Sequence, residues 1–155
     1  MKTIILGLGN PILADDGVGP RVARELEGRL DLQEATVTET SLAGLDMLDL
    51  LAGYDRAIII DAIQTNGGKA GQIYQFKPEA FNATRHAASP HDVNFATALE
   101  LGRKLNLPLP QQITIFGIEA KDVTSFGTEC TPEVMKSVPA CAAMVIRELR
   151  GGRWN

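Results

Sequence analysis

The sequence predicts an α/β fold, a three-layer α/β/α arrangement around a twisted, mostly parallel mixed sheet of about five strands with one strand antiparallel. Two observations support this prediction. Short apolar runs typical of buried strands alternate along the chain with longer segments whose apolar residues recur every three or four positions. In addition, residues 62–70 join two predicted strands without a helical pattern, whereas a parallel crossover needs about a dozen residues. The strand after this loop is therefore expected to run antiparallel to the one before it.

The expected strands are short runs of apolar or β-branched residues. In chain order they cover residues 3–6, 35–40, 56–61, 71–76 and 112–118. The run at 56–61 is the strongest of these, because successive apolar residues lead directly to a closing acid, Asp61.

The expected helices are segments that carry one apolar face. From the first helix to the last, these faces are marked by Val18, Val22, Leu26 and Leu30; by Leu42, Leu45, Leu48 and Leu51; by Val93, Thr97, Leu101 and Leu105, in a helix over 91–105; and by Val134, Val138, Cys141, Val145 and Leu149. The last helix is expected to open at Thr131 and Pro132, an N-cap residue followed by proline at the first helical position.

Length and composition indicate a single globular domain over residues 1–155. The net charge of −4 argues against a nucleic-acid partner. No apolar run approaches the ~20 residues that a membrane-spanning helix needs, and the first strand begins too close to Met1 for a signal peptide. Cys130 and Cys141 fit no zinc-binding spacing and are expected to be free thiols. We therefore expect a cytoplasmic protein with no membrane partner.

The first strand ends in the motif Gly7-Leu8-Gly9-Asn10-Pro11, and two adjacent acids, Asp15 and Asp16, follow it. A dinucleotide-binding fingerprint would need a third glycine at position 12, which is isoleucine, and the two acids would repel a pyrophosphate. Glycines let the chain leave a strand sharply. The segment therefore indicates a cation site at the carboxyl edge of the sheet, where open α/β folds place their ligands.

Asp16, Asp61 and His91 are the candidate catalytic and metal-binding residues. Asp16 follows the first strand, Asp61 ends the third, and His91 lies at the start of the third helix, so that all three can converge at one sheet edge. Their functional atoms are expected within roughly 8 Å of one another. Two carboxylates and an imidazole suit a borderline divalent metal such as nickel or zinc. Such a metal can polarise a peptide carbonyl or lower the pKa of bound water.

Each of these residues also has a plainer interpretation. Asp16 could serve only as a helix N-cap, with Asp15 competing for either role. Asp61 could hydrogen-bond a neighbouring loop, and His91 could be a capping or surface histidine. The other histidine, His86, lies in a polar stretch and is expected to be solvated.

Gly9, Asn10 and Gly44 are expected to support the site or contact the substrate. Asn10 is expected to tie together the loop from 7 to 16 with side-chain-to-backbone hydrogen bonds, and Gly44 to allow close backbone approach near the cleft. No motif places a histidine beside either cysteine, and no Gly-x-Ser-x-Gly elbow is present, which disfavours a cysteine or serine nucleophile.

These motifs are similar, in the same order, to those of the hydrogenase maturation endopeptidases. The segments that carry the resemblance are residues 7–10, 15–19, 41–44, 58–62, 89–91, 116–119 and 131–134. The resemblance implies a twisted mixed sheet with helices on both faces. It also implies an endopeptidase that removes the C-terminal tail of nickel–iron hydrogenase large subunits, in which Asp16, Asp61 and His91 engage the nickel already loaded in the precursor.

Two other functions stay open from the sequence. Peptidyl-tRNA hydrolases also begin with a strand and Gly-Leu-Gly-Asn-Pro, but the residues after Pro11 differ here, and the negative charge disfavours a tRNA partner. A non-catalytic module that senses a metal or a nucleotide on the same scaffold would keep the same candidate ligands. The nickel could then be bound without any cleavage of a peptide bond.

Overall fold

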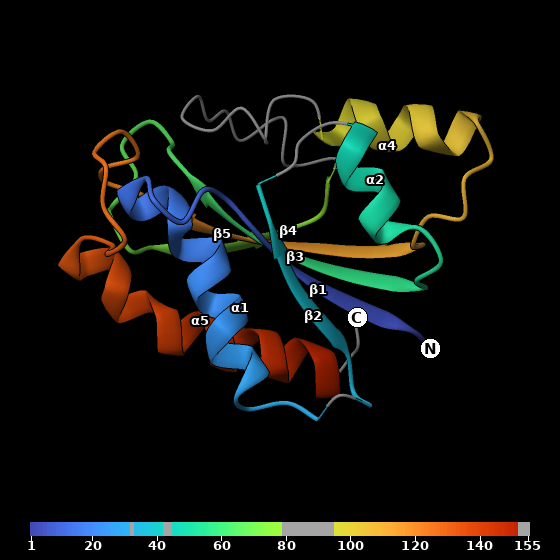
Figure 1. Ribbon diagram of the computed structural model, residues 1–155, viewed down its shortest axis with the longest axis horizontal. Coiled ribbons are helices and arrows are strands. Elements are labelled where there is room, and N and C mark those ends of the chain that lie inside the picture. The colour runs from blue at the N-terminus through green and yellow to red at the C-terminus, as the bar shows by residue number, and fades with distance from the viewer. Residues whose placement is uncertain (32, 42–44, 79–94, 152–155) are drawn as a thin grey trace.

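The computed structural model describes residues 1–31, 33–41, 45–78 and 95–151, and the five strands in these ranges form one mixed sheet (Figure 1). The strands are β1 (Thr3–Leu8), β2 (Thr36–Thr40), β3 (Arg56–Ile63), β4 (Ile73–Phe76) and β5 (Gln112–Glu119). The helices are the 3₁₀ helix η1 (Ala14–Gly17) and the α-helices α1 (Val18–Glu27), α2 (Leu45–Leu51), α4 (Phe95–Lys104) and α5 (Pro132–Gly151). Within the described ranges, no helix is both long and apolar enough to cross a membrane.

The strand order is β2-β1-β3-β5-β4, with every neighbouring pair parallel except β5 and β4. The predicted fold class and the antiparallel direction of β4 are confirmed. The hydrogen-bonded partner of β4, however, is β5, which lies between β4 and β3. The short loop after β3 therefore reverses the chain and leaves room for β5 to pair with β3.

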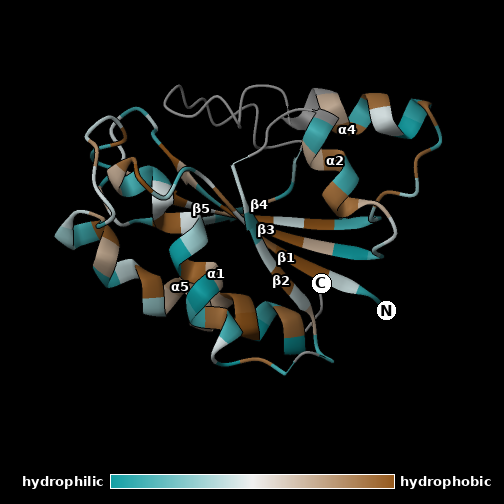
Figure 2. Cartoon of the chain, viewed as in Figure 1, coloured by the Kyte–Doolittle hydropathy of each residue, from teal (hydrophilic) through white to brown (hydrophobic). Residues whose placement is uncertain are grey.

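The sheet buries apolar side chains on both of its faces. Successive side chains of β3 point to opposite faces of the sheet. Ile58 and Ile60 belong to the cluster on one face, and Ala57 and Ile59 belong to a second cluster on the other face. Figure 1 shows α1 and α5 covering the first face and α2 and α4 covering the second. In Figure 2, β1 and β3 are almost continuously hydrophobic, as strands buried on both faces must be.

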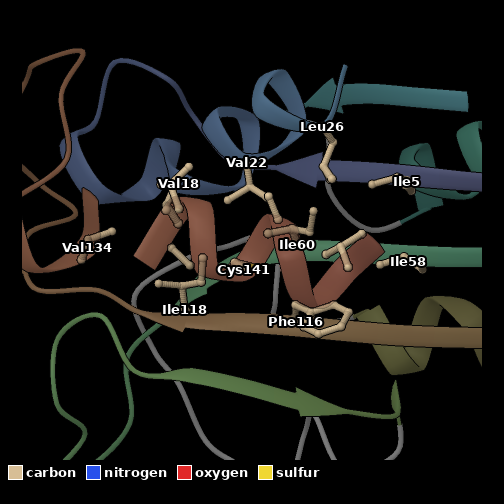
Figure 3. Packing of buried hydrophobic residues seen from close by; sticks show 14 of the residues in the cluster. Ile5, Val18, Val22, Leu26, Ile58, Ile60, Phe116, Ile118, Val134 and Cys141 are labelled. Carbon is tan, nitrogen blue, oxygen red and sulfur yellow. The ribbon is translucent and has the colours of Figure 1, made fainter. Parts of the chain in front are cut away.

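The cluster beneath α1 and α5 is the larger of the two. Figure 3 shows Val18, Val22 and Leu26 of α1 pointing toward the sheet residues, with Cys141 of α5 packed beside them. These positions are buried as the helical spacing predicts, and Val134, Val138 and Val145 are buried along α5. The predicted faces of the first and last helices are therefore confirmed with two exceptions. Leu30 lies beyond the end of α1 and is only partly buried, and Leu149 of α5 is also only partly buried.

The predicted inner face of α4 is wrong. Leu101 is 40% exposed and Leu105 is 61% exposed, whereas Ala98 and Leu99 are buried. Gly102 also lies on the packed side, because a Cβ atom there would sit 3.0 Å from Leu48 of α2. Alanine and glycine let the helix approach its neighbour closely, but they carry too little hydrophobicity to mark a face in the sequence. The predicted position Val93 lies outside the described residues, and the structure does not describe the side chain of Thr97.

A buried ion pair anchors the last turn of α5 to the start of β3. The Arg56 guanidinium lies 3.0 Å from the Glu148 carboxylate, with side chains only 8% and 10% exposed. Arg56 also donates to the backbone carbonyls of Glu148 and Leu149, and the Thr114 hydroxyl donates to Glu148. A cation is favourable at these carbonyls, which have no partner inside the helix.

We expect Arg56→Ala to lower the free energy of unfolding by about 3–5 kcal/mol, because it leaves the buried Glu148 carboxylate without its cation. Urea denaturation monitored by circular dichroism measures this change. The matched control is Arg24→Ala, which removes the exposed Arg24–Glu39 pair and should change stability by less than about 1 kcal/mol. Equal losses in the two variants would contradict an anchoring role for Arg56.

Candidate functional site

The connections of the chain diverge at the carboxyl ends of β1 and β3. From β1 the chain passes through η1 and α1 to β2, at one edge of the sheet. From β3 it continues to β4 and β5, toward the opposite edge. Leu8, the last residue of β1, is the register partner of Asp61 in β3. Open α/β sheets bind ligands at such a switch point, outside the carboxyl ends of the strands. The strand does not end at Asp61 as predicted but continues to Ile63, where it still pairs with β5. Asp61 therefore lies in the last part of β3, close to the edge where this fold is expected to hold a ligand.

Asp61 is 1% exposed. Its place in the alternation of β3 puts it on the face covered by α2 and α4, where Ile59 and Ile63 are buried. Burial of a carboxylate among such neighbours is unfavourable unless polar or cationic groups compensate it. A buried carboxylate at the mouth of a switch point is therefore a functional-site candidate rather than an ordinary strand residue.

The loop between β1 and η1 is held by Asn10. The side-chain oxygen Oδ1 of Asn10 accepts the N–H of Ile12 at 3.1 Å, and its carbonyl accepts the N–H of Leu13 at 3.2 Å. The contact with Ile12 is the predicted side-chain-to-backbone hydrogen bond of Asn10, whereas the contact with Leu13 is made by its backbone. In addition, the N–H of Asn10 donates to Oδ2 of Asp16 at 2.9 Å, which fixes one oxygen of the candidate ligand.

Glycines let this loop fold back onto the strand ends. Gly9 has a φ of +148°, and a Cβ atom at this position would lie only 1.9 Å from the carbonyl oxygen of Asp16. A Cβ atom at Gly19 would likewise lie 2.5 Å from the carbonyl oxygens of Leu8 and Ile60. As a result, η1 packs against β3, and the buried Asp16, 5% exposed, belongs to the same sheet edge as Asp61.

Neither acid of the pair caps the first helix. The N-cap residue of α1 is Gly17, and no side chain makes a capping hydrogen bond there. The interpretation of Asp16 as a simple N-cap is therefore wrong, because both acids lie within η1, which precedes α1. Asp15 has a different task, since its carboxylate accepts hydrogen bonds from the backbone of Lys121, Asp122 and Thr131.

The structure thus separates two acids that look alike in the sequence. Asp15 is fully buried and directed toward the segment between β5 and α5, whereas Asp16 accepts from the loop that leaves β1. Sequence reasoning did not assign this role to Asp15. Only the long-range contact reveals it, because its partners lie more than one hundred positions away in the chain.

Two of the predicted site residues, His91 and Gly44, lie outside the described residues, as does His86. In the part of the chain that the structure does describe, no three His, Cys, Asp or Glu side chains are grouped closely enough to hold a metal ion. The predicted convergence of Asp16, Asp61 and His91 within about 8 Å therefore stays a prediction.

Another buried acid, Glu119, ends β5 at the same edge of the sheet. Its carboxylate accepts the N–H and the hydroxyl of Thr65, at 2.8 and 2.7 Å, and the hydroxyl of Tyr74 at 3.0 Å. Burial of the Tyr74 hydroxyl raises the pKa of that group. Glu119 therefore stabilises the loop between β3 and β4.

The thiol groups are poorly suited to nucleophilic chemistry. Burial raises the pKa of Cys141 to about 12, and this residue lies in the core beneath α5. Burial, together with the negative charge of Asp15, raises the pKa of Cys130 as well. Since the thiolate is the nucleophile, both effects disfavour attack by sulfur.

Comparisons with known proteins point to one family. A sequence profile described as "HycI: Hydrogenase maturation protease" matches residues 20–148, a range that includes Asp61 and His91 and begins after Asp16. The hydrogenase 2 maturation protease of Escherichia coli K12 is 27% identical over 152 residues, covering 97% of this chain and 92% of the relative.

Solved structures agree with this match. The hydrogenase maturating endopeptidase HybD from E. coli superposes with a TM-score of 0.84 at 26% identity, covering 98% of this chain and 94% of the other. The [NiFe] hydrogenase maturation protease HybD from Thermococcus kodakarensis gives a TM-score of 0.77 at 28% identity, covering 95% and 98%. The likeness therefore spans nearly the whole chain.

We expect Gly9→Ala to lower the free energy of unfolding by about 1–3 kcal/mol, because the new Cβ atom would meet the Asp16 backbone at a φ that alanine disfavours. Urea denaturation measures the change. Gly28→Ala is the matched control, since its nearest neighbour would lie at 3.7 Å and its φ is −79°. A Gly9→Ala variant as stable as Gly28→Ala would show that the loop does not need this close approach.

Proposed function

The chain belongs to the hydrogenase maturation protease family and is a hydrogenase maturation endopeptidase, and we propose that it removes the C-terminal tail of a nickel-loaded [NiFe] hydrogenase large-subunit precursor. One observation carries this proposal beyond family membership. The switch point between β1 and β3 holds two buried carboxylates, Asp16 and Asp61, on neighbouring segments of the chain. Carboxylate oxygens at a ligand-binding edge suit a cation.

In this proposal the nickel ion belongs to the substrate. Asp16, Asp61 and His91 are the catalytic and metal-contacting residues, and they approach an ion that the precursor already coordinates. Three oxygen and nitrogen donors leave coordination positions for the precursor's own ligands. The enzyme would thus test whether the metal is present before it cuts, with Gly9, Asn10 and Gly44 shaping the surface on which the tail lies.

The chemistry required is the hydrolysis of one peptide bond. Water adds its oxygen to the scissile carbonyl carbon, the carbon–nitrogen bond breaks, and the released amine takes up a proton. A nearby divalent ion can polarise the carbonyl or lower the pKa of the attacking water. The negative charges of Asp16 and Asp61 attract the ion and help to hold it beside the scissile bond. The raised pKa values of the two cysteine thiols argue against a covalent sulfur intermediate.

The proposed role also concerns the domain organisation, the cellular compartment and the kind of partner. We propose that residues 1–155 act as one domain in the cytoplasm, on a protein partner and without nucleic acid or membrane. Both cysteines are free and buried, as suits a reducing compartment. Family membership argues against a peptidyl-tRNA hydrolase, and the cleavage assays below separate a protease from a module that only senses the metal.

We expect Asp16→Asn, Asp61→Asn and His91→Ala to stay folded while tail removal slows by at least about a hundredfold. Each asparagine keeps the shape of the carboxylate but loses its negative charge, and His91→Ala loses the imidazole nitrogen that would contact the metal. Mass spectrometry of nickel-loaded precursor measures the tail loss. Asp31→Asn, at an exposed position, and His86→Ala are the matched controls and should cleave at the wild-type rate. Full activity of Asp61→Asn would refute the proposed site.

Nickel dependence needs a separate assay. We expect wild-type protein to remove the tail from nickel-loaded precursor and to leave nickel-free precursor intact, since the ion forms part of the recognised surface. Both precursor forms should first be shown to be folded by circular dichroism. Equal cleavage of the two forms would rule out metal sensing even though the protein is a protease.

The fold itself should not need a metal. We expect the same melting temperature with and without a chelator, because the two apolar clusters are formed by the protein alone. Differential scanning calorimetry checks this, and added Ni²⁺ should bind only weakly. A large drop in melting temperature on chelation would instead indicate a structural metal.

A further inference from the structure

We propose that Asp15 is a positioning residue for the cleavage reaction: its buried carboxylate holds Asp16 in place by clamping the loop after β1 to the segment between β5 and α5. The proposal rests on the proposed function, in which Asp16 contacts the metal of the precursor. Asp15 itself touches neither the substrate nor the metal.

The clamp consists of hydrogen bonds to one side chain. Oδ2 of Asp15 accepts the backbone N–H groups of Lys121 and Asp122, both at 2.9 Å. Oδ1 accepts the N–H of Thr131 at 2.7 Å, and the Thr131 hydroxyl lies 2.9 Å from Oδ2 and 3.1 Å from Oδ1. Asp15 is 0% exposed, so these contacts operate away from water and each is stronger than on the surface.

The backbone continues the same contact between the two segments. The N–H of Asp15 donates to the carbonyl of Asp122 at 2.8 Å, and the N–H of Ala14 donates to Gly127 at 3.1 Å. In return, the N–H of Gly127 donates to Ile12 at 2.9 Å. The loop that carries Asp16 is therefore paired along its length with the segment that leads into α5.

Ala14 shows that this pairing imposes a conformation that the loop would not adopt alone. Its φ is +48°, in the left-handed region that an alanine disfavours. A residue keeps such an unfavourable backbone conformation only where contacts with the surrounding structure hold it there. The hydrogen bonds of Ala14 and Asp15 to the segment before α5 hold Ala14 in this conformation. Asp16 is the next residue in the chain.

Helical geometry then fixes the direction of Asp16. Successive side chains of a 3₁₀ helix are about 120° apart, so an inward-directed Asp15 turns Asp16 to a different side of η1. There, Oδ2 of Asp16 accepts the N–H of Asn10, and η1 rests against β3, the strand of Asp61. A rotation or shift of η1 would displace Asp16 relative to Asp61.

An amide cannot replace the Asp15 carboxylate. All of the groups that contact its two oxygens are donors, two N–H groups on one oxygen and one on the other, with the hydroxyl between them. In Asp15→Asn, one oxygen becomes an NH₂ group that faces at least one backbone N–H group whichever way the amide is turned. The clamp would loosen while the volume of the side chain stays the same.

The test compares Asp15→Asn with wild-type protein on nickel-loaded precursor. We expect kcat to fall about tenfold to a hundredfold, as for a small displacement of a reacting group, with KM changed less than about twofold. A readout independent of turnover is the affinity of the protein for Ni²⁺ alone by isothermal titration calorimetry, which should weaken at least about fivefold.

The matched control separates positioning from stability. Val145→Ala removes buried volume beneath α5, away from the carboxyl edge, and should lower the melting temperature without touching the clamp. Both variants are assayed at a temperature at which each is fully folded by circular dichroism. We expect Val145→Ala to keep the wild-type kcat and Ni²⁺ affinity.

The outcomes distinguish this inference from the proposed function. If Asp16→Asn is inactive and Asp15→Asn keeps the wild-type kcat and Ni²⁺ affinity, only the positioning role is overturned. The same holds if kcat falls equally in Val145→Ala, because activity would then follow stability. If Asp16→Asn cleaves at the wild-type rate, the proposed site is wrong and the role of Asp15 is overturned with it.

Discussion

The hydrogen bonds between the Asp15 carboxylate and the backbone of residues 121–131 are the interaction on which the carboxyl edge of this sheet depends. They join two chain segments that the sheet alone would leave apart, since one follows β1 and the other follows β5. A buried carboxylate satisfied by backbone N–H groups is a rigid junction in a nonpolar setting. The loop of Asp16, the end of β5 and the start of α5 therefore form one unit beside Asp61.

Helix α5 extends this unit across the molecule. At its first turn it is tied to Asp15 through Thr131, and at its last turn it is tied to β3 through Arg56 and Glu148. Between the two polar ends, its apolar face packs against α1 and the sheet (Figure 3). Polar contacts at the two ends fix the position of the helix along its axis, which apolar packing alone specifies less sharply. The glycines at the ends of β1 and α1 then allow η1 to lie directly on the strands.

Much of this arrangement is predictable from the sequence, because the hydrophobic periods and the Gly-x-Gly-Asn motif are local signals. They identify the fold class, the direction of β4 and the loop-tying role of Asn10. The packed face of α4 is not predictable in the same way, since Ala98 and Gly102 pack through small size and not through hydrophobicity. The different hydrogen-bonding roles of Asp15 and Asp16 are not predictable either, because the partners of Asp15 are distant in sequence. The roles of Asp61 and His91 depend on a partner protein and stay predictions.

The most direct test of the central claim is nickel K-edge X-ray absorption on precursor frozen immediately after mixing with the protein, compared with precursor alone. If Asp16, Asp61 and His91 contact the ion, the nickel gains oxygen or nitrogen neighbours at about 2.0–2.2 Å, distances usual for such ligands. The gain should shrink when His91→Ala replaces the wild-type protein. Identical spectra with and without wild-type protein, in a sample that goes on to lose its tail, would contradict metal recognition by these residues.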